Sequence, residues 1–227
     1  MAKRRRRLGV SLLLILLVGA AGWLLGWSSF LTVKQIEVVG VAVDSPLKTE
    51  AIIALSGVRI GEPMARVSSA SVKRDLNRLP RIGKVSLVRK WPHRVVLVIK
   101  ERAPALAIVK GSEFELIDSD GNQYATVPVV PVGVPTLTIG GDYKASLKTA
   151  MSVIDFLPAN IRSQVSQIES SGVDGLQLTL QRGVQVIWGS SEELSVKSRV
   201  LTTLLAGPGA EKVHVFDVSA PYAPTTN

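Results

Sequence analysis

The sequence contains no cysteine and only two histidines among its 227 residues. The absence of cysteine excludes a disulfide framework, a thiol nucleophile and a thiolate metal site. His93 and His214 are too few for a His-rich metal site, and they stand far apart in the chain. Neither has a serine or acidic partner recognisable from the sequence, so a catalytic triad is not expected.

Complete catalytic and ligand-binding motifs are also missing. Ser45 and Lys48 have the Ser-x-x-Lys spacing of penicillin-interacting enzymes, but the accompanying motifs are absent, so Ser45 is predicted to cap a helix instead. The acidic run from Asp118 to Asn122 lacks calcium-loop spacing and is predicted to form a hairpin turn. No glycine-rich phosphate loop is present. We therefore expect no enzymatic activity, cofactor, metal or small-molecule substrate, with an extracytoplasmic cell-wall transpeptidase or hydrolase as the alternative.

Positive charge is concentrated at the start of the chain. The formal charge is +9, and five of the basic residues lie within the first seven positions. The remainder holds 22 Lys and Arg against 18 Asp and Glu, which is only mildly basic. Such a balance does not indicate a nucleic-acid partner.

An uncharged, largely apolar run follows this basic cluster. It is long enough to cross the roughly 30 Å hydrocarbon core, so we expect a cytoplasmic tail at residues 1–7 and a transmembrane helix at residues 8–30. The expected anchor includes Leu12, Leu13, Leu14, Ile15, Leu16 and Leu17, with Trp23 and Trp27 in an interfacial aromatic belt. A signal peptide cleaved near Gly22 is the alternative, but the apolar run resumes at Trp23, which favours a retained anchor.

The rest of the chain is predicted to be α+β. In residues 31–102, period-two patterns predict strands near 34–39, 85–88 and 95–99, and apolar stripes predict helices from about Ser45 and Ser69. This order, strand-helix-helix-strand-strand, buries one face of a sheet under two helices. Residues 103–219 are predicted to form a mostly β domain with helices after Asp142 and Ser190 and a loop at 128–141. Residues 220–227 are predicted to be an irregular tail.

Several short motifs occur in an order that resembles the FtsQ/DivIB family of bacterial cell-division proteins. They are Ile36-x-Val38-x-Gly40, Leu79-Pro80, Arg89-x-Trp91-Pro92, Val98-x-x-Glu101-Arg102-x-Pro104-Ala105 and Leu116-Ile117-Asp118-x-x-Gly121. The run from Asp217 to Pro221 looks like actinobacterial members. The resemblance is strongest over residues 30–127 and continues more loosely to Val218.

The resemblance implies a single-pass type II protein of the cell membrane at the division septum, with most of the chain extracytoplasmic. It implies a transmembrane helix, a POTRA domain (β-α-α-β-β) and a mostly β C-terminal domain with helices. The family has no enzymatic activity and is a scaffold of the divisome that recruits or regulates septal peptidoglycan synthesis. Its partners are FtsB-like and FtsL-like single-pass division proteins. A POTRA-bearing export or assembly factor is a further alternative, although no repeated POTRA unit or following barrel is readable.

The last strand is the expected partner-binding segment. Val213–Val218 is strand-like and comes last, so we expect it at a sheet edge that accepts a partner strand. The residues expected to contribute are Val215, Phe216, Asp217, Val218 and Ser219, with Lys197 or Arg199 steering acidic groups. Ser219 and Ala220 stand where many members of the family carry an arginine and a tyrosine, and Tyr222 is expected to replace that aromatic. The alternative is that Phe216 and Val218 only pack inward.

Overall fold

The computed structural model describes residues 12–16, 19, 22, 31–172 and 174–227. Most of the expected anchor, including Leu17, Trp23 and Trp27, lies outside this part of the chain. Leu12–Leu16 are helical, and their side chains are 57–70% exposed. None of the helices in the described ranges is long and apolar enough to cross a membrane. The chain divides into two compact units, Met1–Arg102 and Ala103–Asn227.

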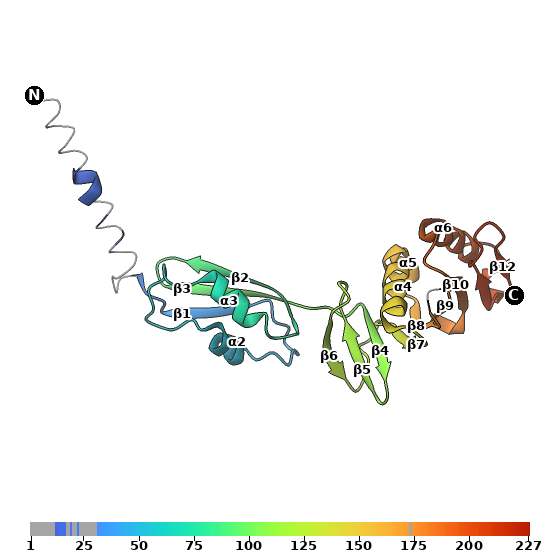
Figure 1. The fold of residues 1–227 in the computed structure, drawn as a ribbon, viewed down its shortest axis with the longest axis horizontal. Helices are drawn as coiled ribbons and strands as arrows, with labels where there is room; N and C mark the ends of the chain where they lie inside the picture. The colour runs from blue at the N-terminus through green and yellow to red at the C-terminus, as the bar shows by residue number, and fades with distance from the viewer. Residues whose placement is uncertain (1–11, 17–18, 20–21, 23–30, 173) are drawn as a thin grey trace, which may run out of the picture. The chain divides into compact units, whose positions relative to one another are not determined.

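The first unit contains a three-stranded sheet and two helices. Strands β1 (Gln35–Val39), β2 (Ile82–Lys90) and β3 (Arg94–Glu101) lie in the order β1-β3-β2, with β1 parallel and β2 antiparallel to β3. Helices α2 (Thr49–Ser56) and α3 (Ser69–Leu76) come between β1 and β2 in the chain (Figure 1). The predicted order, strand-helix-helix-strand-strand, is therefore confirmed. Both helices contribute to a buried cluster with the sheet, including Ile52, Val72, Leu76, Val95, Leu97 and Ile99.

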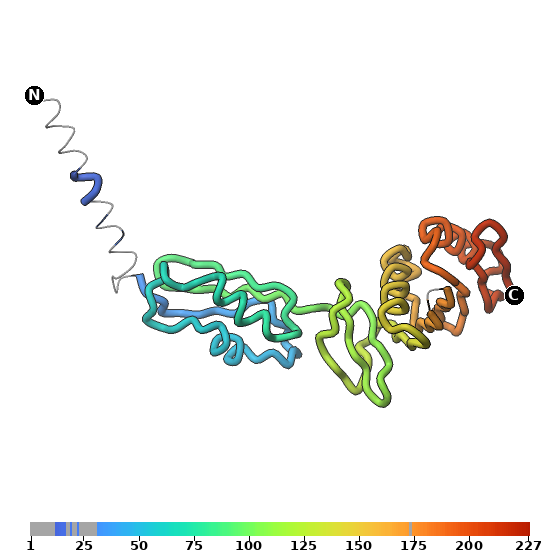
Figure 2. The backbone as a smooth tube through the Cα atoms, in the orientation of Figure 1, coloured from blue at the N-terminus to red at the C-terminus, as the bar shows by residue number. Residues whose placement is uncertain are grey.

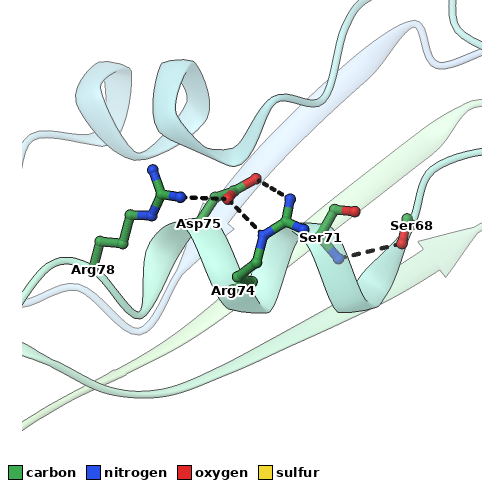
Figure 3. Close-up of polar contacts among 5 residues, drawn as sticks. All are labelled: Ser68, Ser71, Arg74, Asp75 and Arg78. Carbon is green, nitrogen blue, oxygen red and sulfur yellow. Dashed lines mark hydrogen bonds and ion pairs between the residues drawn. The ribbon is translucent and has the colours of Figure 1, made fainter.

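Helix α3 begins where the sequence predicts. The Ser68 hydroxyl caps it by accepting a hydrogen bond from the Ser71 N–H at 3.2 Å (Figure 3). Near its end, the Asp75 carboxylate lies 3.1 Å from Arg74 and 3.9 Å from Arg78. The hydrogen bond from Arg74 lowers the pKa of Asp75. Because both arginines are exposed, solvent screens the pairs and they add little stability.

Helix α2 begins later than predicted. Its N-cap is Lys48, and Ser45 does not cap it. The Ser45 hydroxyl instead donates to the Glu101 carboxylate at 2.7 Å and accepts from the Leu47 N–H at 3.1 Å. Glu101 also accepts a hydrogen bond from the Ala42 N–H at 2.9 Å. Glu101 at the end of β3 therefore holds the loop after β1 through Ala42 and Ser45.

The second unit contains a nine-stranded mixed sheet in the order β12-β11-β10-β9-β8-β7-β4-β5-β6. Its strands are β4 (Leu106–Lys110), β5 (Glu113–Ile117), β6 (Gln123–Val127), β7 (Thr136–Ile139), β8 (Val165–Ser170), β9 (Leu176–Leu180), β10 (Gln185–Gly189), β11 (Val215–Asp217) and β12 (Thr225–Thr226). Its helices are α4 (Tyr143–Phe156), α5 (Ala159–Arg162) and α6 (Leu194–Leu205), with 3₁₀ turns at Gln181–Gly183 and Ala210–Lys212. The expected mostly β architecture with helices is confirmed.

The main core of this unit lies between the sheet and helices α4 and α6. Ala150 and Ile154 from α4 and Leu201 from α6 belong to one buried cluster with residues of seven strands, including Leu106, Ile117, Leu137, Ile168, Leu178, Val186, Trp188 and Phe216. The Asp142 carboxylate caps α4 by accepting from the Ala145 N–H at 2.7 Å, as predicted. The clusters place α6 and the last strands on a common core, and this is where the expected partner-binding residues lie.

Candidate protein–protein interface

The expected partner-binding residues gather around β11, the residues that follow it and the exposed side of α6. Strand β11 runs parallel to β10, with Phe216 opposite Val186 and Asp217 opposite Ile187. The Val218 N–H continues this ladder by donating to the Ile187 carbonyl at 2.9 Å. The backbone groups on one side of β11 are therefore already bonded to β10.

The side chains of Phe216 and Val218 point inward. They are 1% and 0% exposed and belong to the main core. Their side chains are therefore unavailable to a partner, because the period of two turns alternate residues toward the core, and strand addition along Val215–Ser219 stays a prediction about the backbone. Val215 and Asp217 are half-buried, and Ser219 is exposed. These three remain the members of the segment available at the surface.

The outer side of β11 is covered by the end of the chain. Strand β12 pairs antiparallel with it, placing Thr226 opposite Phe216 and Thr225 opposite Asp217. Val215 exchanges both backbone hydrogen bonds with Asn227, at 2.9 and 3.0 Å, and the His214 N–H also donates to the Asn227 carbonyl. Figure 2 shows the last residues returning beside the preceding segment. The expectations of a free edge at β11 and a wholly irregular tail are therefore wrong.

The sequence signal for β12 is weak because the strand is only two residues long. Pro221 and Pro224 before it suggest irregular structure, and no run of alternating residues follows them. The pair of β-branched residues, Thr225 and Thr226, is the one local indication of a strand. What stabilises this strand is pairing with β11, which a local pattern does not reveal.

Lys197 lies in the interior and does not face a partner. It is 2% exposed, and its ammonium donates to the carbonyls of Trp188 and Ser190 at 3.1 and 3.0 Å. Burial lowers the pKa of Lys197, while nearby carboxylates, first among them Glu193, act in the opposite direction. The expectation that Lys197 steers acidic groups at the surface is wrong. Its role is to hold the connection between β10 and α6.

Arg199 lies on the exposed side of α6. Its Nε donates to the Ser195 carbonyl at 3.3 Å, within the same helix. It borders a shallow groove whose other lining residues are Val196, Val200, Thr203, Leu204 and Pro224. Apolar side chains beside one cation suit a partner helix or strand that carries an acidic group.

Tyr222 fastens the tail to the start of α6. Its ring is 80% exposed, and its hydroxyl donates to the Glu193 carboxylate at 2.8 Å. This bond raises the pKa of Tyr222. Glu193 itself has φ of 50°, and its side chain makes no capping hydrogen bond to the helix that follows. Glu193 instead gives the tail an attachment point.

A tight contact fixes the end of β11. Gly189 has φ of +75°, and a side chain there would meet the Ser219 Cβ at 3.0 Å. Ser219 in turn donates to the Asp217 carboxylate through its N–H at 2.9 Å and its hydroxyl at 2.7 Å. The backbone of Gly189 therefore lies close against Ser219.

The described residues offer binding surfaces and no arrangement for catalysis. His93 Nδ1 lies 3.2 Å from the Thr32 carbonyl, and the Ser45 hydroxyl is engaged with the Glu101 carboxylate. Within the ranges that the structure covers, no group of three or more His, Cys, Asp or Glu side chains is placed to hold a metal ion. Around β11 and α6 the structure offers backbone pairing, apolar contact and the exposed cation of Arg199.

Comparisons with known proteins agree with this architecture. The family model described as "POTRA domain, FtsQ-type" matches residues 31–102, and "Cell division protein FtsQ/DivIB, C-terminal" matches residues 106–219. A "Cell division protein FtsQ" from Streptomyces venezuelae is 35% identical over 98% of this chain and 84% of its own length. Another from Streptomyces bingchenggensis is 37% identical over 97% of this chain and 86% of its own length.

More distant relatives carry the same name. "Cell division protein FtsQ" from Mycobacterium leprae is 29% identical over 90% of this chain and 60% of its own length. A solved structure of the major extracytoplasmic domain of the cell-division protein DivIB from Geobacillus stearothermophilus covers 50% of this chain and 96% of its own, at 16% identity and a TM-score of 0.37. That structural similarity is too low to support an argument about the fold.

Proposed function

Because the chain belongs to the FtsQ/DivIB family of cell-division proteins, we propose that it is a non-catalytic scaffold of the division machinery, anchored in the cell membrane at the septum. In this proposal, residues 8–30 span the membrane with the N-terminus in the cytoplasm, and the two units lie outside. The scaffold binds FtsB-like and FtsL-like single-pass partners, and through them it recruits or regulates septal peptidoglycan synthesis.

The described part of the N-terminal segment supports the anchor. Five consecutive apolar side chains, Leu12–Leu16, are helical and exposed, an arrangement that is unfavourable in water and favourable in lipid. The five basic residues among the first seven favour a cytoplasmic N-terminus.

The observation that carries the partner-binding proposal is the covering of β11. The two-residue strand β12 and Asn227 after it pair with its outer side, and these three residues are exposed. Short terminal segments fray easily, because few contacts hold them. A longer partner strand could therefore take the place of β12 and pair with Val215–Ser219. The groove beside Arg199 would then receive side chains of the same partner.

Proline at position 215 tests this mode of binding. The Val215 N–H points to the outer side of β11, so Val215→Pro removes a donor from the partner ladder and leaves the ladder with β10 unchanged. The chain used should end at Tyr222, because the tail would otherwise lose the same bond and mask the effect. We expect roughly tenfold weaker binding of the extracytoplasmic segment of the FtsB-like partner, measured by interferometry.

Val215→Ala in the same shortened chain is the matched control, since it keeps the N–H and removes most of the side chain. Binding that survives Val215→Ala and falls with Val215→Pro supports backbone pairing. Equal affinities for the Val215→Pro chain and the shortened parent, with both chains melting at similar temperatures, would show that the partner does not add a strand here.

A further inference from the structure

One end of the first unit lies beside the residues through which the chain enters it. The turn between β2 and β3 (Trp91, Pro92 and His93) meets the start of β1: the His93 carbonyl accepts hydrogen bonds from the Lys34 and Gln35 N–H groups at 2.8 and 3.2 Å. In Figure 1 this turn and the start of β1 occupy the same end of the unit. The turn therefore lies beside the start of β1, near the point where the chain enters the unit.

The loop between α2 and α3 contributes to the same end. The Val33 N–H donates to the Glu62 carbonyl at 2.9 Å, and the Gly61 N–H donates to the Val33 carbonyl at 2.8 Å. These bonds place Arg59 and Ile60 next to the start of β1. We name Lys34, Arg59, Ile60, Lys90 and Trp91 the basic aromatic face.

This face exposes apolar side chains that the fold does not use. Ile60 is 63% exposed and Trp91 is 48% exposed. Neither belongs to the buried cluster of the unit. A half-exposed tryptophan with a polar ring nitrogen is the side chain most typical of a membrane–water interface.

Cations surround these apolar side chains. Lys34, Arg59 and Lys90 are exposed members of the face, and the neighbouring Arg66 and Arg94 are also exposed. Two carboxylates lie nearby: Glu37 pairs with Arg94 at 3.5 Å, and the Glu62 carboxylate accepts from the Arg59 N–H at 3.5 Å. The positive charge at this end therefore exceeds the negative charge.

The charge of the two units differs in sign. Residues 31–102 contain fourteen Lys and Arg and six Asp and Glu, a formal charge of +8. Residues 103–227 contain eight Lys and Arg and twelve Asp and Glu, a formal charge of −4. The mildly basic average of the chain conceals this contrast. An anionic surface would attract the first unit and repel the second.

We propose that the basic aromatic face rests on anionic phospholipid headgroups of the membrane that holds the anchor, an inference that depends on the anchoring proposed above. Lys34 follows the end of the expected anchor by four residues, and a chain spans at most about 3.6 Å per residue, so Lys34 lies within roughly 15 Å of the bilayer. Trp91 and Ile60 insert at the headgroup level, while Lys34, Arg59 and Lys90 contact phosphate.

Fluorescence quenching in reconstituted vesicles tests this contact. Because the natural chain has no cysteine, a single introduced cysteine carries an environment-sensitive dye at one chosen site. Pro92→Cys reports on the basic aromatic face. Val43→Cys reports on the opposite end of the same unit, because the neighbouring Ala42 bonds to Glu101 at the far end of β3. Leu16→Cys reports on the anchor.

In full-length protein in vesicles of phosphatidylglycerol and phosphatidylcholine, lipids with a headgroup quencher are expected to quench the dye at position 92 several-fold more than at position 43. The excess should disappear in pure phosphatidylcholine and in about 1 M salt, where the screening length falls to roughly 3 Å. The double substitution Lys34→Glu and Lys90→Glu should at least halve the excess quenching at position 92. The control pair, Lys84→Glu and Lys100→Glu, makes the same charge change at the other end of β2 and β3 and should leave this excess unchanged.

The outcomes separate this contact from the anchor. A quenched dye at position 16 with equal, weak quenching at positions 43 and 92 would overturn the lipid contact and leave the anchor intact. If a headgroup quencher acts on the dye at position 92 but a quencher on the lipid acyl chains does not act on the dye at position 16, the anchor is overturned and the lipid contact of the face is not. If both double variants lose the same share of the excess quenching at position 92, the unit is attracted to the membrane by its overall charge, and the proposed face is overturned. An anionic cell-wall polymer as the true partner would leave position 92 unquenched in every vesicle.

Discussion

Lys197 acts on the interface from inside the fold. Its ammonium holds the carbonyls of Trp188 and Ser190, which flank Gly189, and Gly189 packs against Ser219 at the end of β11. The lysine therefore positions the strand end without touching a partner. From the sequence, its place on a helix next to Arg199 suggested a surface cation, because no local pattern shows which of two basic residues faces the core.

We expect Lys197→Met to lower the free energy of unfolding of the second unit by about 1–2 kcal/mol. The buried Trp188 carbonyl and the partly buried Ser190 carbonyl would lose their donor, and this outweighs the relief of removing a buried charge that nearby carboxylates already stabilise. Peptide-level hydrogen exchange around β10 and α6 measures the change. Arg199→Met, on the exposed side of the same helix, should alter stability by less than about 0.5 kcal/mol. Equal effects from the two substitutions would remove the structural role assigned to Lys197.

Gly40 and Gly57 allow a matched comparison in the first unit. Both have positive φ, 87° and 69°, which costs a residue with a side chain roughly 1–2 kcal/mol. A Cβ at Gly40 would lie 2.1 Å from the Ile99 carbonyl oxygen, whereas a Cβ at Gly57 meets nothing within 4 Å. We expect Gly57→Ala to cost about 1 kcal/mol and Gly40→Ala to cost at least about 3 kcal/mol, because β1 must shift against β3. Denaturant unfolding followed by hydrogen exchange of β3 distinguishes the two, and similar costs would contradict the close approach.

At the level of elements, the sequence pattern predicts the helices and strands whose formation depends on neighbouring residues. The start of α4 after Asp142 and the start of α3 near Ser69 are readable because each signal lies within a few residues. Strand β7 was hidden in a segment assigned to a loop, because Pro135 and Gly140 flank its four residues. Strand β8 alternates imperfectly. Parallel pairing of β7 with β4 and β8 stabilises both, and such pairing is not visible in a short window.

The same reasoning applies to the candidate interface. The location at the last strand follows from its place in the chain and from the family resemblance. The covering strand β12 and the bond from Tyr222 to Glu193 depend on contacts between distant residues. Tyr222 was expected to meet a partner in place of the missing aromatic, and the structure gives it a second role as the fastening of the tail.

At the scale of the whole molecule, the two units carry charges of opposite sign, and the candidate surfaces fall on different units. The basic aromatic face belongs to the unit that follows the expected anchor, and the β11 edge belongs to the unit that ends the chain. In the proposed scaffold, lipid and protein bind separate surfaces, so substitutions at one surface should leave binding at the other unchanged.

The central claim is that a partner strand takes the place of β12 on β11, and shortening the chain to end at Tyr222 tests it most directly. The deletion removes Asn227 and the three backbone hydrogen bonds that it makes with His214 and Val215. Such bonds at a fraying end contribute about 1–2 kcal/mol together, so the loss of this competitor should strengthen binding of the FtsB-like segment roughly 5- to 30-fold. The measurement is the Kd of the full and shortened chains, with melting curves to confirm that both are folded. Tighter binding by the shortened chain is the expected result, and unchanged or weaker binding by a folded shortened chain would contradict the displacement of β12.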